Sequence, residues 1–241
     1  MSLLVCEGLS KRFGGVQALD GVDLRVEPGE IVGLVGPNGS GKTTLINLLS
    51  GSFPASGGRI VFDGEDVTRM APHKRAHLGI ARTYQIPRPL SSMSVLDNVV
   101  VALEFGRDRM DPAAAHRRGT EILERVGLER RAGYATDDLN LHERKFLEVA
   151  RALAQEPKLL LLDEVLAGLN AAEVEEGLSL IADVRQSGVA VLYIEHNVKA
   201  VTRLSDRLYV LSQGRNLSEG TPADVVADQR VVDAYLGTAH A

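Results

Sequence analysis

The feature that most constrains this chain is a glycine-rich segment between an apolar run and a segment able to form a helix. The run, Ile31 to Val35, predicts a strand buried on both faces, and a helix is predicted over Thr43 to Leu49. The segment itself has the spacing G-x-x-x-x-G-K-[ST] and consists of Gly36, Pro37, Asn38, Gly39, Ser40, Gly41, Lys42, Thr43 and Thr44. Its small residues let backbone N–H groups turn toward phosphate oxygens, and the helix directs its positive end at them. We therefore expect a nucleotide site, with Lys42 on the β- and γ-phosphates and the Thr43 hydroxyl on Mg²⁺.

The competing interpretation of this segment is a glycine-rich turn with a surface lysine. The predicted strand before it and helix after it argue against that interpretation.

Strands and helices alternate in the C-terminal part of the sequence. Strands are predicted over Lys158 to Leu162, Val189 to Ile194 and Arg207 to Leu211, and helices over Ala171 to Gln186 and Val198 to Leu204. This order predicts an α/β fold with a mostly parallel sheet covered on both faces. Near the N-terminus, Val22, Leu24 and Val26 alternate with polar residues and predict antiparallel strands. Thr221 and Pro222 predict the start of a last helix.

The middle of the chain has a helical character. Asp111 and Pro112 form an N-cap and first-turn pair for a helix through Val126, and a second helix is predicted from His142 to Ala154. We expect a single domain over residues 1–241. Its nucleotide-binding core comprises residues 1–86 and 157–241, and residues 87–156 form a helical subdomain.

Composition excludes several classes of protein. The 27 Lys and Arg against 32 Asp and Glu give a net charge of −5, which argues against nucleic acid as a main partner. With 44% hydrophobic residues the chain can fill a core, and a disordered chain is not expected. Cys6 is the single cysteine, so no intrachain disulfide is possible. We recognise no signal peptide and no run of about 18 apolar residues that could span a bilayer.

Two carboxylates follow the apolar strand that begins at Lys158. Ligand sites of parallel sheets lie at the C-terminal ends of the strands, so Asp163 and Glu164 are expected at the edge where the phosphate-binding loop lies. Asp163 is predicted to hold Mg²⁺, directly or through water, and Glu164 to act as general base on the attacking water. By itself such a pair is more often a solvated turn.

Two weaker candidates complete the predicted site. His196 follows the strand Val189 to Ile194 and could contact the γ-phosphate or orient the water, although a lone histidine is more often structural. The Gln85 amide could bind Mg²⁺ and water, although most glutamines are surface residues.

The order of these elements resembles that of the ATPase subunits of ABC transporters over essentially the whole chain. The details are most similar to the subunits of branched-chain (hydrophobic) amino acid uptake systems. The segments that carry this resemblance are Gly79-Ile80-Ala81-Arg82-Thr83-Tyr84-Gln85, Leu162-Asp163-Glu164, Ala167-Gly168-Leu169-Asn170, Ile194-Glu195-His196-Asn197, Glu219-Gly220-Thr221-Pro222 and Val232-Asp233-Ala234-Tyr235-Leu236-Gly237.

The resemblance implies an ATP hydrolase that uses Mg²⁺ and works in pairs on the cytoplasmic face of the inner membrane. Its implied partners are a second ATPase subunit, transmembrane permease subunits and, indirectly, an extracytoplasmic solute-binding protein. Phe13 would stack on adenine, with core packing as the alternative. Pro87 to Val101 would line a groove for a coupling helix of the permease, or form a small core instead.

One segment departs from the family pattern. The signature Leu-Ser-Gly-Gly-Gln reads here Leu139-Asn140-Leu141-His142-Glu143. In this fold the signature opens a helix and contacts the γ-phosphate of ATP held by the opposite subunit, so Asn140 and His142 are expected there. Asn140 can supply an N–H in place of the serine hydroxyl, whereas Leu141 and His142 cannot approach as closely as glycines.

The departure leaves two interpretations. Either the segment has its own workable geometry, or it serves a partner site that turns over poorly. We favour an asymmetric heterodimer over a homodimer, with the competent site formed by the phosphate-binding loop and Glu164 of this chain. Other functions consistent with the motifs are a lipid or lipopolysaccharide exporter ATPase and a non-transport ABC ATPase. A GTPase-type switch is disfavoured because the chain lacks an Asn-Lys-x-Asp segment.

Overall fold

The structure is a computed structural model that describes residues 1–107, 109–195 and 198–236. Within these residues the strands form two sheets. The smaller sheet has the order β2-β1-β4-β5 and is antiparallel, with β1 at Leu4–Phe13, β2 at Val16–Val26, β4 at Gly57–Phe62 and β5 at Glu65–Asp66. The predicted antiparallel N-terminal region is therefore confirmed.

The larger sheet has the order β10-β9-β3-β8-β7-β6. Its strands are β3 (Ile31–Val35), β6 (Ile80–Arg82), β7 (Leu159–Asp163), β8 (Ala190–Ile194), β9 (Arg207–Ser212) and β10 (Arg215–Gly220). All neighbours pair in parallel except β10, which runs antiparallel to β9. This confirms the predicted α/β fold with a mostly parallel sheet, although β6 and β10 were not predicted.

Alternate residues of the larger sheet belong to two different hydrophobic cores. Leu160 and Leu162 of β7 pack into a core with the helices α3 to α6, whereas Leu159 and Leu161 pack into a core with α1 and the smaller sheet. Successive side chains of a strand point to opposite faces, so a strand that is apolar throughout is covered on both. Gly33 allows close packing of α7 on β3, because a Cβ there would lie 2.3 Å from Val201 Cγ1.

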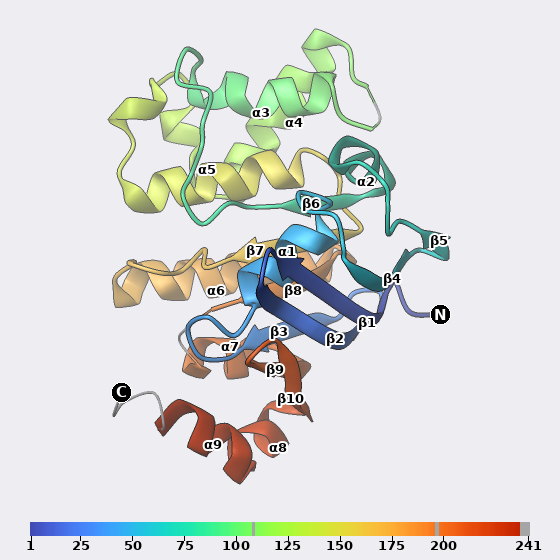
Figure 1. The fold of residues 1–241 in the computed structure, drawn as a ribbon. Coiled ribbons are helices and arrows are strands. Elements are labelled where there is room, and N and C mark those ends of the chain that lie inside the picture. The colour runs from blue at the N-terminus through green and yellow to red at the C-terminus, as the bar shows by residue number, and fades with distance from the viewer. Residues whose placement is uncertain (108, 196–197, 237–241) are drawn as a thin grey trace.

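Helices cover both faces of the larger sheet, and α3, α4 and α5 gather at one end of the molecule (Figure 1). The helices are α1 (Lys42–Leu49), α2 (Pro72–Leu78), α3 (Val95–Glu104), α4 (Pro112–Arg125), α5 (Leu141–Leu153), α6 (Ala171–Gln186), α7 (Val198–Leu204), α8 (Pro222–Ala227) and α9 (Gln229–Leu236), with short 3₁₀ turns at Glu129–Arg131 and Thr136–Asp138. Within the described ranges, no helix combines the length and the apolar character needed to span a membrane.

Local capping chemistry explains where several helices begin. Asp111 accepts a hydrogen bond from the Ala114 N–H at the start of α4, and Thr221 accepts one from Asp224 at the start of α8, as predicted. Helices α2, α3 and α9 were not predicted. Within the segment Pro87 to Val101, buried Val95 of α3 joins the core, while Leu90 and Met93 are each 37% exposed. The expected core packing is therefore present in part of the segment, and its role as a groove for a coupling helix stays a prediction.

Candidate functional site

The phosphate-binding loop joins the end of β3 to the start of α1. Gly39 and Gly41 have left-handed backbones (φ 76° and 105°), and a Cβ at Gly41 would lie 2.6 Å from Leu19 Cδ2. Only glycine fits that position without strain. The first N–H groups of α1 have no side-chain cap, which leaves them directed at a cavity of about 480 Å³. The cavity is lined by residues 38–44 together with Ala18, Gln85 and Glu164.

Two polar groups of the loop are prepared for an anion. Lys42 is 5% exposed, and its ammonium group donates to the carbonyl oxygens of Gly36 (2.7 Å) and Pro37 (2.9 Å). Burial lowers the pKa of Lys42, and the nearby Glu164 and Asp163 oppose that shift. The buried Ser40 hydroxyl has no hydrogen-bond partner among the described protein atoms. A phosphate oxygen in the cavity would provide acceptors for both groups, so the loop fits a nucleotide.

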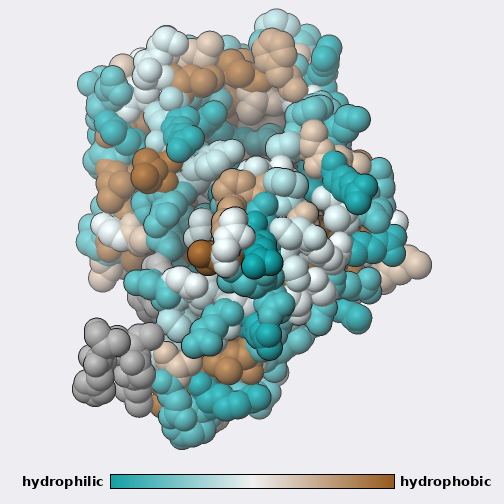
Figure 2. Space-filling view, in the orientation of Figure 1, coloured by the Kyte–Doolittle hydropathy of each residue, from teal (hydrophilic) through white to brown (hydrophobic). Residues whose placement is uncertain are grey.

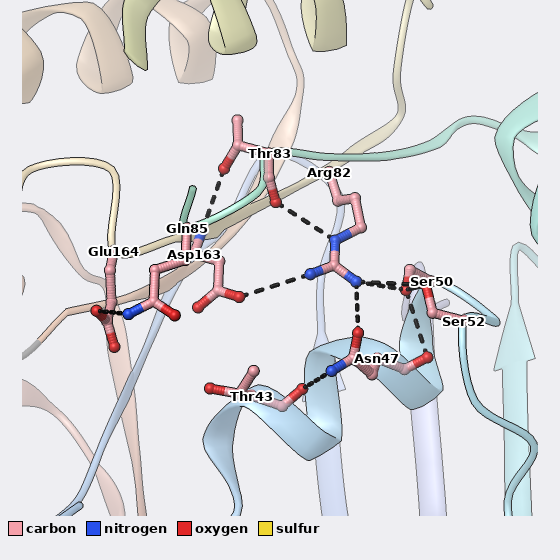
Figure 3. Close-up of polar contacts among 9 residues, drawn as sticks. All are labelled: Thr43, Asn47, Ser50, Ser52, Arg82, Thr83, Gln85, Asp163 and Glu164. Carbon is pink, nitrogen blue, oxygen red and sulfur yellow. Dashed lines mark hydrogen bonds and ion pairs between the residues drawn. The ribbon is translucent and has the colours of Figure 1, made fainter. Parts of the chain in front are cut away.

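Both predicted carboxylates lie at the C-terminal end of β7, as expected. Asp163 and Glu164 are 1% and 8% exposed. The Gln85 amide nitrogen donates to Glu164 Oε2 at 2.6 Å, and Glu164 has a left-handed backbone (φ 52°), which is uncommon for a residue other than glycine (Figure 3). This contact brings Gln85 and Glu164 together at the wall of the cavity. The predicted general base is thus buried next to the phosphate-binding loop.

The oxygen atoms near this wall suit a hard divalent cation. Because the Gln85 nitrogen is bonded to Glu164, its amide oxygen remains for a metal ion. The Thr43 side chain is exposed at the start of α1, and Asp163 supplies a carboxylate. Within the described residues no cluster of three His, Cys, Asp or Glu side chains is present. Mg²⁺ is commonly held by few protein oxygens plus phosphates, so this donor set fits Mg²⁺.

Sequence reasoning missed the side chains that support the carboxylates. Lys145 donates from its ammonium group to the backbone oxygens of Glu164 (2.9 Å) and Ala167 (2.5 Å). The Arg82 guanidinium lies 3.6 Å from Asp163 Oδ2 and is 10% exposed. The Thr83 hydroxyl accepts from the Asp163 N–H at 3.2 Å. The available sequence signal was the position of Arg82 and Thr83 just before Gln85. The structure places Arg82 at the end of β6, beside β7, and Thr83 directly after it.

The departing signature segment forms the start of α5. Asn140 is the N-cap: its side-chain oxygen accepts from the Glu143 N–H, and Glu143 accepts from the Asn140 N–H, both at 2.9 Å. Leu141 is 49% exposed. His142 turns toward α6, with Nε2 3.4 Å from Glu176 Oε2 and its ring centroid 4.1 Å from that of Phe146. None of residues 139–143 lines the phosphate cavity, so one chain does not bring the two segments together.

Two other predicted residues lie apart from this cavity or outside the description. Phe13 is 42% exposed and meets Phe53 edge to face at a centroid distance of 5.4 Å. This exposure argues against the core-packing alternative, but Phe13 does not line the cavity around the phosphate-binding loop. His196 lies outside the described residues.

Comparison with known proteins identifies the family. Residues 19–167 match the ABC transporter family. The chain belongs to that family. Residues 215–241 match a second family, described as branched-chain amino acid ATP-binding cassette transporter. Members of the ABC transporter family hydrolyse ATP, so the chain is an ATP-hydrolysing cassette, and such cassettes dimerise and work with transmembrane permease subunits.

Individual relatives and structures agree with this assignment. The probable branched-chain amino acid transport ATP-binding protein LivG of Archaeoglobus fulgidus is 37% identical, covering 98% of this chain and 96% of the relative. The lipopolysaccharide export system ATP-binding protein LptB of Escherichia coli strain K12 is 36% identical, covering 98% of each chain. The crystal structure of a nucleotide-free ATP-binding cassette from an ABC transporter has a TM-score of 0.88 and 31% identity, covering 98% of this chain and 99% of that one.

The C-terminal segment of the cassette reaches the nucleotide site. Tyr235 of α9 packs against the hydrophobic core. Burial raises the pKa of its hydroxyl, and a hydrogen bond with the backbone of Gly36 opposes that shift. The last helix therefore contacts the first residue of the phosphate-binding loop.

Proposed function

We propose that this cassette powers the import of branched-chain or other hydrophobic amino acids. The observation that carries this proposal is the match of residues 215–241 to the branched-chain amino acid cassettes. That segment includes α8 and α9, which lie outside the ATPase core matched by the general family. LivG of Archaeoglobus fulgidus, named for the same transport, supports it.

A second candidate is the ATPase subunit of a lipid or lipopolysaccharide exporter. LptB supports this candidate because it is almost as similar as LivG over the same share of the chain. Importers and exporters use the same nucleotide chemistry, so the shared core does not distinguish them. A non-transport ABC ATPase is the third and weakest alternative.

For hydrolysis, Lys42 and residues 36–44 bind the phosphates, and Glu164 accepts a proton from the attacking water. The contact from Gln85 orients the Glu164 carboxylate. His196 contacts the γ-phosphate or orients the water, and Phe13 stacks on adenine. Thr43, Gln85 and Asp163 would hold Mg²⁺, which would supply positive charge to offset the charge that develops on the phosphates.

The complete site requires a second cassette. The start of α5, where Asn140 is exposed and His142 is half-buried, would face ATP held by the opposite subunit. Because the altered signature has no glycine at positions 141 and 142, the partner's site is expected to turn over more slowly than the one built on Lys42 and Glu164. An asymmetric heterodimer follows, with a homodimer as the alternative.

The permease subunits would dock on a cavity of about 480 Å³ on the side of the molecule that carries α3. Tyr84, Arg88, Phe105 and Arg151 contribute to its lining. Many of the hydrophobic groups on the face seen in Figure 2 lie over the end formed by α3, α4 and α5. We propose that residues 87–156 act as a helical subdomain against the core of residues 1–86 and 157–241. Docking would hold the cassette at the cytoplasmic face of the inner membrane, where a solute-binding protein delivers solute from the other side.

Uptake of radiolabelled leucine, isoleucine and valine by cells that lack this gene tests the proposed solute. We expect uptake to fall to background, to return with the wild-type gene, and to stay low with Glu164→Gln. Unchanged uptake together with a defect in lipopolysaccharide export would favour the second candidate instead.

A further inference from the structure

The Arg82 guanidinium joins two elements that carry proposed metal ligands. One terminal nitrogen donates to Asn47 Oδ1 (2.8 Å) and Ser50 Oγ (3.0 Å) near the end of α1. The other terminal nitrogen faces Asp163 Oδ2 of β7 at 3.6 Å. Figure 3 shows the planar group placed between α1 and the carboxylate. Arg82 itself lies on β6, the strand next to β7, so the group is fixed at its base as well.

The link continues through Asn47 to the start of α1. The Asn47 amide nitrogen donates to the backbone oxygen of Thr43 at 2.8 Å, while the Asn47 side-chain oxygen accepts from Arg82. Thr43, Asn47, Arg82 and Asp163 thus form a continuous chain of polar contacts. Its two ends are the hydroxyl residue and the carboxylate residue of the proposed Mg²⁺ site.

We propose that Arg82 and Asn47 are positioning residues that fix Thr43 and Asp163 relative to each other for Mg²⁺. This inference rests on the proposed metal site. Mg²⁺ accepts little deviation from octahedral geometry, with oxygen ligands at about 2.0–2.1 Å, so its binding is sensitive to the separation of two protein ligands on different elements. Residues that orient metal ligands commonly change metal affinity by roughly 10- to 100-fold when they are mutated.

An arginine suits this task better than a lysine. Its planar group presents five N–H donors in a fixed arrangement, so it can bond α1 on one side and face Asp163 on the other. A lysine carries its three donors on one nitrogen, so it lacks the two separated terminal nitrogens with which Arg82 reaches α1 and Asp163. Burial lowers the pKa of Arg82, but Tyr84, whose ring lies 4.5 Å from the guanidinium, and Asp163 oppose that shift.

The charge of Arg82 and its role in holding the ligands predict opposite effects of its loss on the affinity for Mg²⁺. A positive charge 3.6 Å from Asp163 competes with a metal cation, so its removal alone would strengthen Mg²⁺ binding. The loss of the fixed arrangement of Thr43 and Asp163 would weaken Mg²⁺ binding. At 3.6 Å the contact with Asp163 is an ion pair longer than a hydrogen bond, whereas the contacts with Asn47 and Ser50 are well-formed hydrogen bonds. We therefore expect the geometric effect to dominate.

The test measures the affinity of the full chain for ADP by calorimetry, in EDTA and over a series of MgCl₂ concentrations. Arg82→Gln and Arg82→Lys should each reduce the Mg²⁺ enhancement of ADP affinity by about 10-fold and leave the affinity in EDTA unchanged. Asn47→Ala should reproduce the loss, and the Asn47→Ala, Arg82→Lys double variant should lose little more, because both residues belong to one link.

Arg75→Lys is the matched control. Arg75 is 2% exposed and also donates to the end of α1, at the Leu48 and Leu49 carbonyl oxygens (2.6 and 2.8 Å). Among the described residues, its hydrogen bonds go to the carbonyl oxygens of residues 48, 49, 68 and 70, and none goes to Thr43 or Asp163. Arg75→Lys should lower the melting temperature yet keep the wild-type Mg²⁺ enhancement. Asn47→Ala, at a half-buried position, keeps the test decisive if the Arg82 variants fold poorly.

Three outcomes would overturn the inference. They are a stronger Mg²⁺ enhancement in Arg82→Gln, a wild-type enhancement in Arg82→Lys, and an equal loss of ADP affinity with and without Mg²⁺. The metal site itself is tested separately by Thr43→Val and Asp163→Asn. If the wild type shows no Mg²⁺ enhancement, or if both of these variants retain it, the proposed metal site fails and the inference fails with it.

Discussion

The phosphate-binding loop and the signature segment differ in how much of their chemistry lies within one chain. Around the loop, a single chain brings Lys42, Gln85 and Glu164 to one cavity. At the signature, Asn140 is used as an N-cap, and His142 packs against Phe146. The first segment therefore shares one cavity with other candidate site residues of the same chain, whereas the second contributes mainly to the structure of its own helix.

This contrast separates two uses of a helix N-terminus. Helix α1 begins at Lys42, and its N-cap residue Gly41 provides no side-chain cap, so the first N–H groups remain available for phosphate. Helix α5 begins with a capping box in which Asn140 and Glu143 bond to each other's N–H groups. A capped helix start has fewer free donors for an anion. We infer that the signature segment acts on nucleotide less strongly than the phosphate-binding loop.

The substitution with the largest expected effect on ATP binding and turnover lies in the phosphate-binding loop. Lys42→Ala removes the ammonium group that lies buried at the cavity, and we expect it to abolish ATP binding and lower turnover by at least on the order of 100- to 1,000-fold. Nucleotide binding by calorimetry and phosphate release would measure it. Arg215→Ala, which removes an exposed ion pair with Asp20, serves as the surface control and should behave as wild type. Undiminished turnover in Lys42→Ala would contradict the assignment of this loop.

The next largest effect is expected when the general base is removed from one of the two ATP sites of the proposed heterodimer. Glu164→Gln removes the general base of the site built on this chain's loop, and turnover of the complex should fall by about 100-fold or more. The equivalent substitution in the partner subunit should lower turnover much less, because the partner's site faces the altered signature. ATP turnover of the two single variants in the assembled complex measures this, with ATP binding as the control. Equal losses would contradict the asymmetry.

The site residues that could be predicted from the sequence lie at or just after the ends of strands. Lys42, Asp163 and Glu164 follow apolar strands, and parallel strands bring their C-terminal ends to one edge, so the sequence predicted their neighbourhood. The strand Ile31–Val35 and the helix Ala171–Gln186 were predicted with the bounds that the structure gives.

Other parts depended on tertiary packing that local patterns do not encode. The three-residue strand β6 is too short for a periodic signal, so the position of Arg82 beside β7 was not predicted. Helix α3 was missed because the apolar residues of Pro87 to Val101 were interpreted as lining either a groove or a small core, without a helix being predicted there. The direction of the His142 ring depends on Phe146 and Glu176, the latter from a separate helix.

The smallest expected effect concerns the cap of α5. Asn140→Ala removes the acceptor for the Glu143 N–H and should lower the free energy of unfolding by about 1 kcal/mol, whereas Asn140→Ser keeps an equally good cap. Urea unfolding of both variants measures this. If Asn140 also contacts ATP of the opposite subunit, Asn140→Ala lowers turnover at the partner's site and Asn140→Ser retains it, because the serine hydroxyl can donate in its place. A loss of stability in Asn140→Ala with unchanged turnover would show that Asn140 acts only as a helix cap. The signature segment would then contribute to the partner's ATP site only through the dipole and backbone N–H groups of α5.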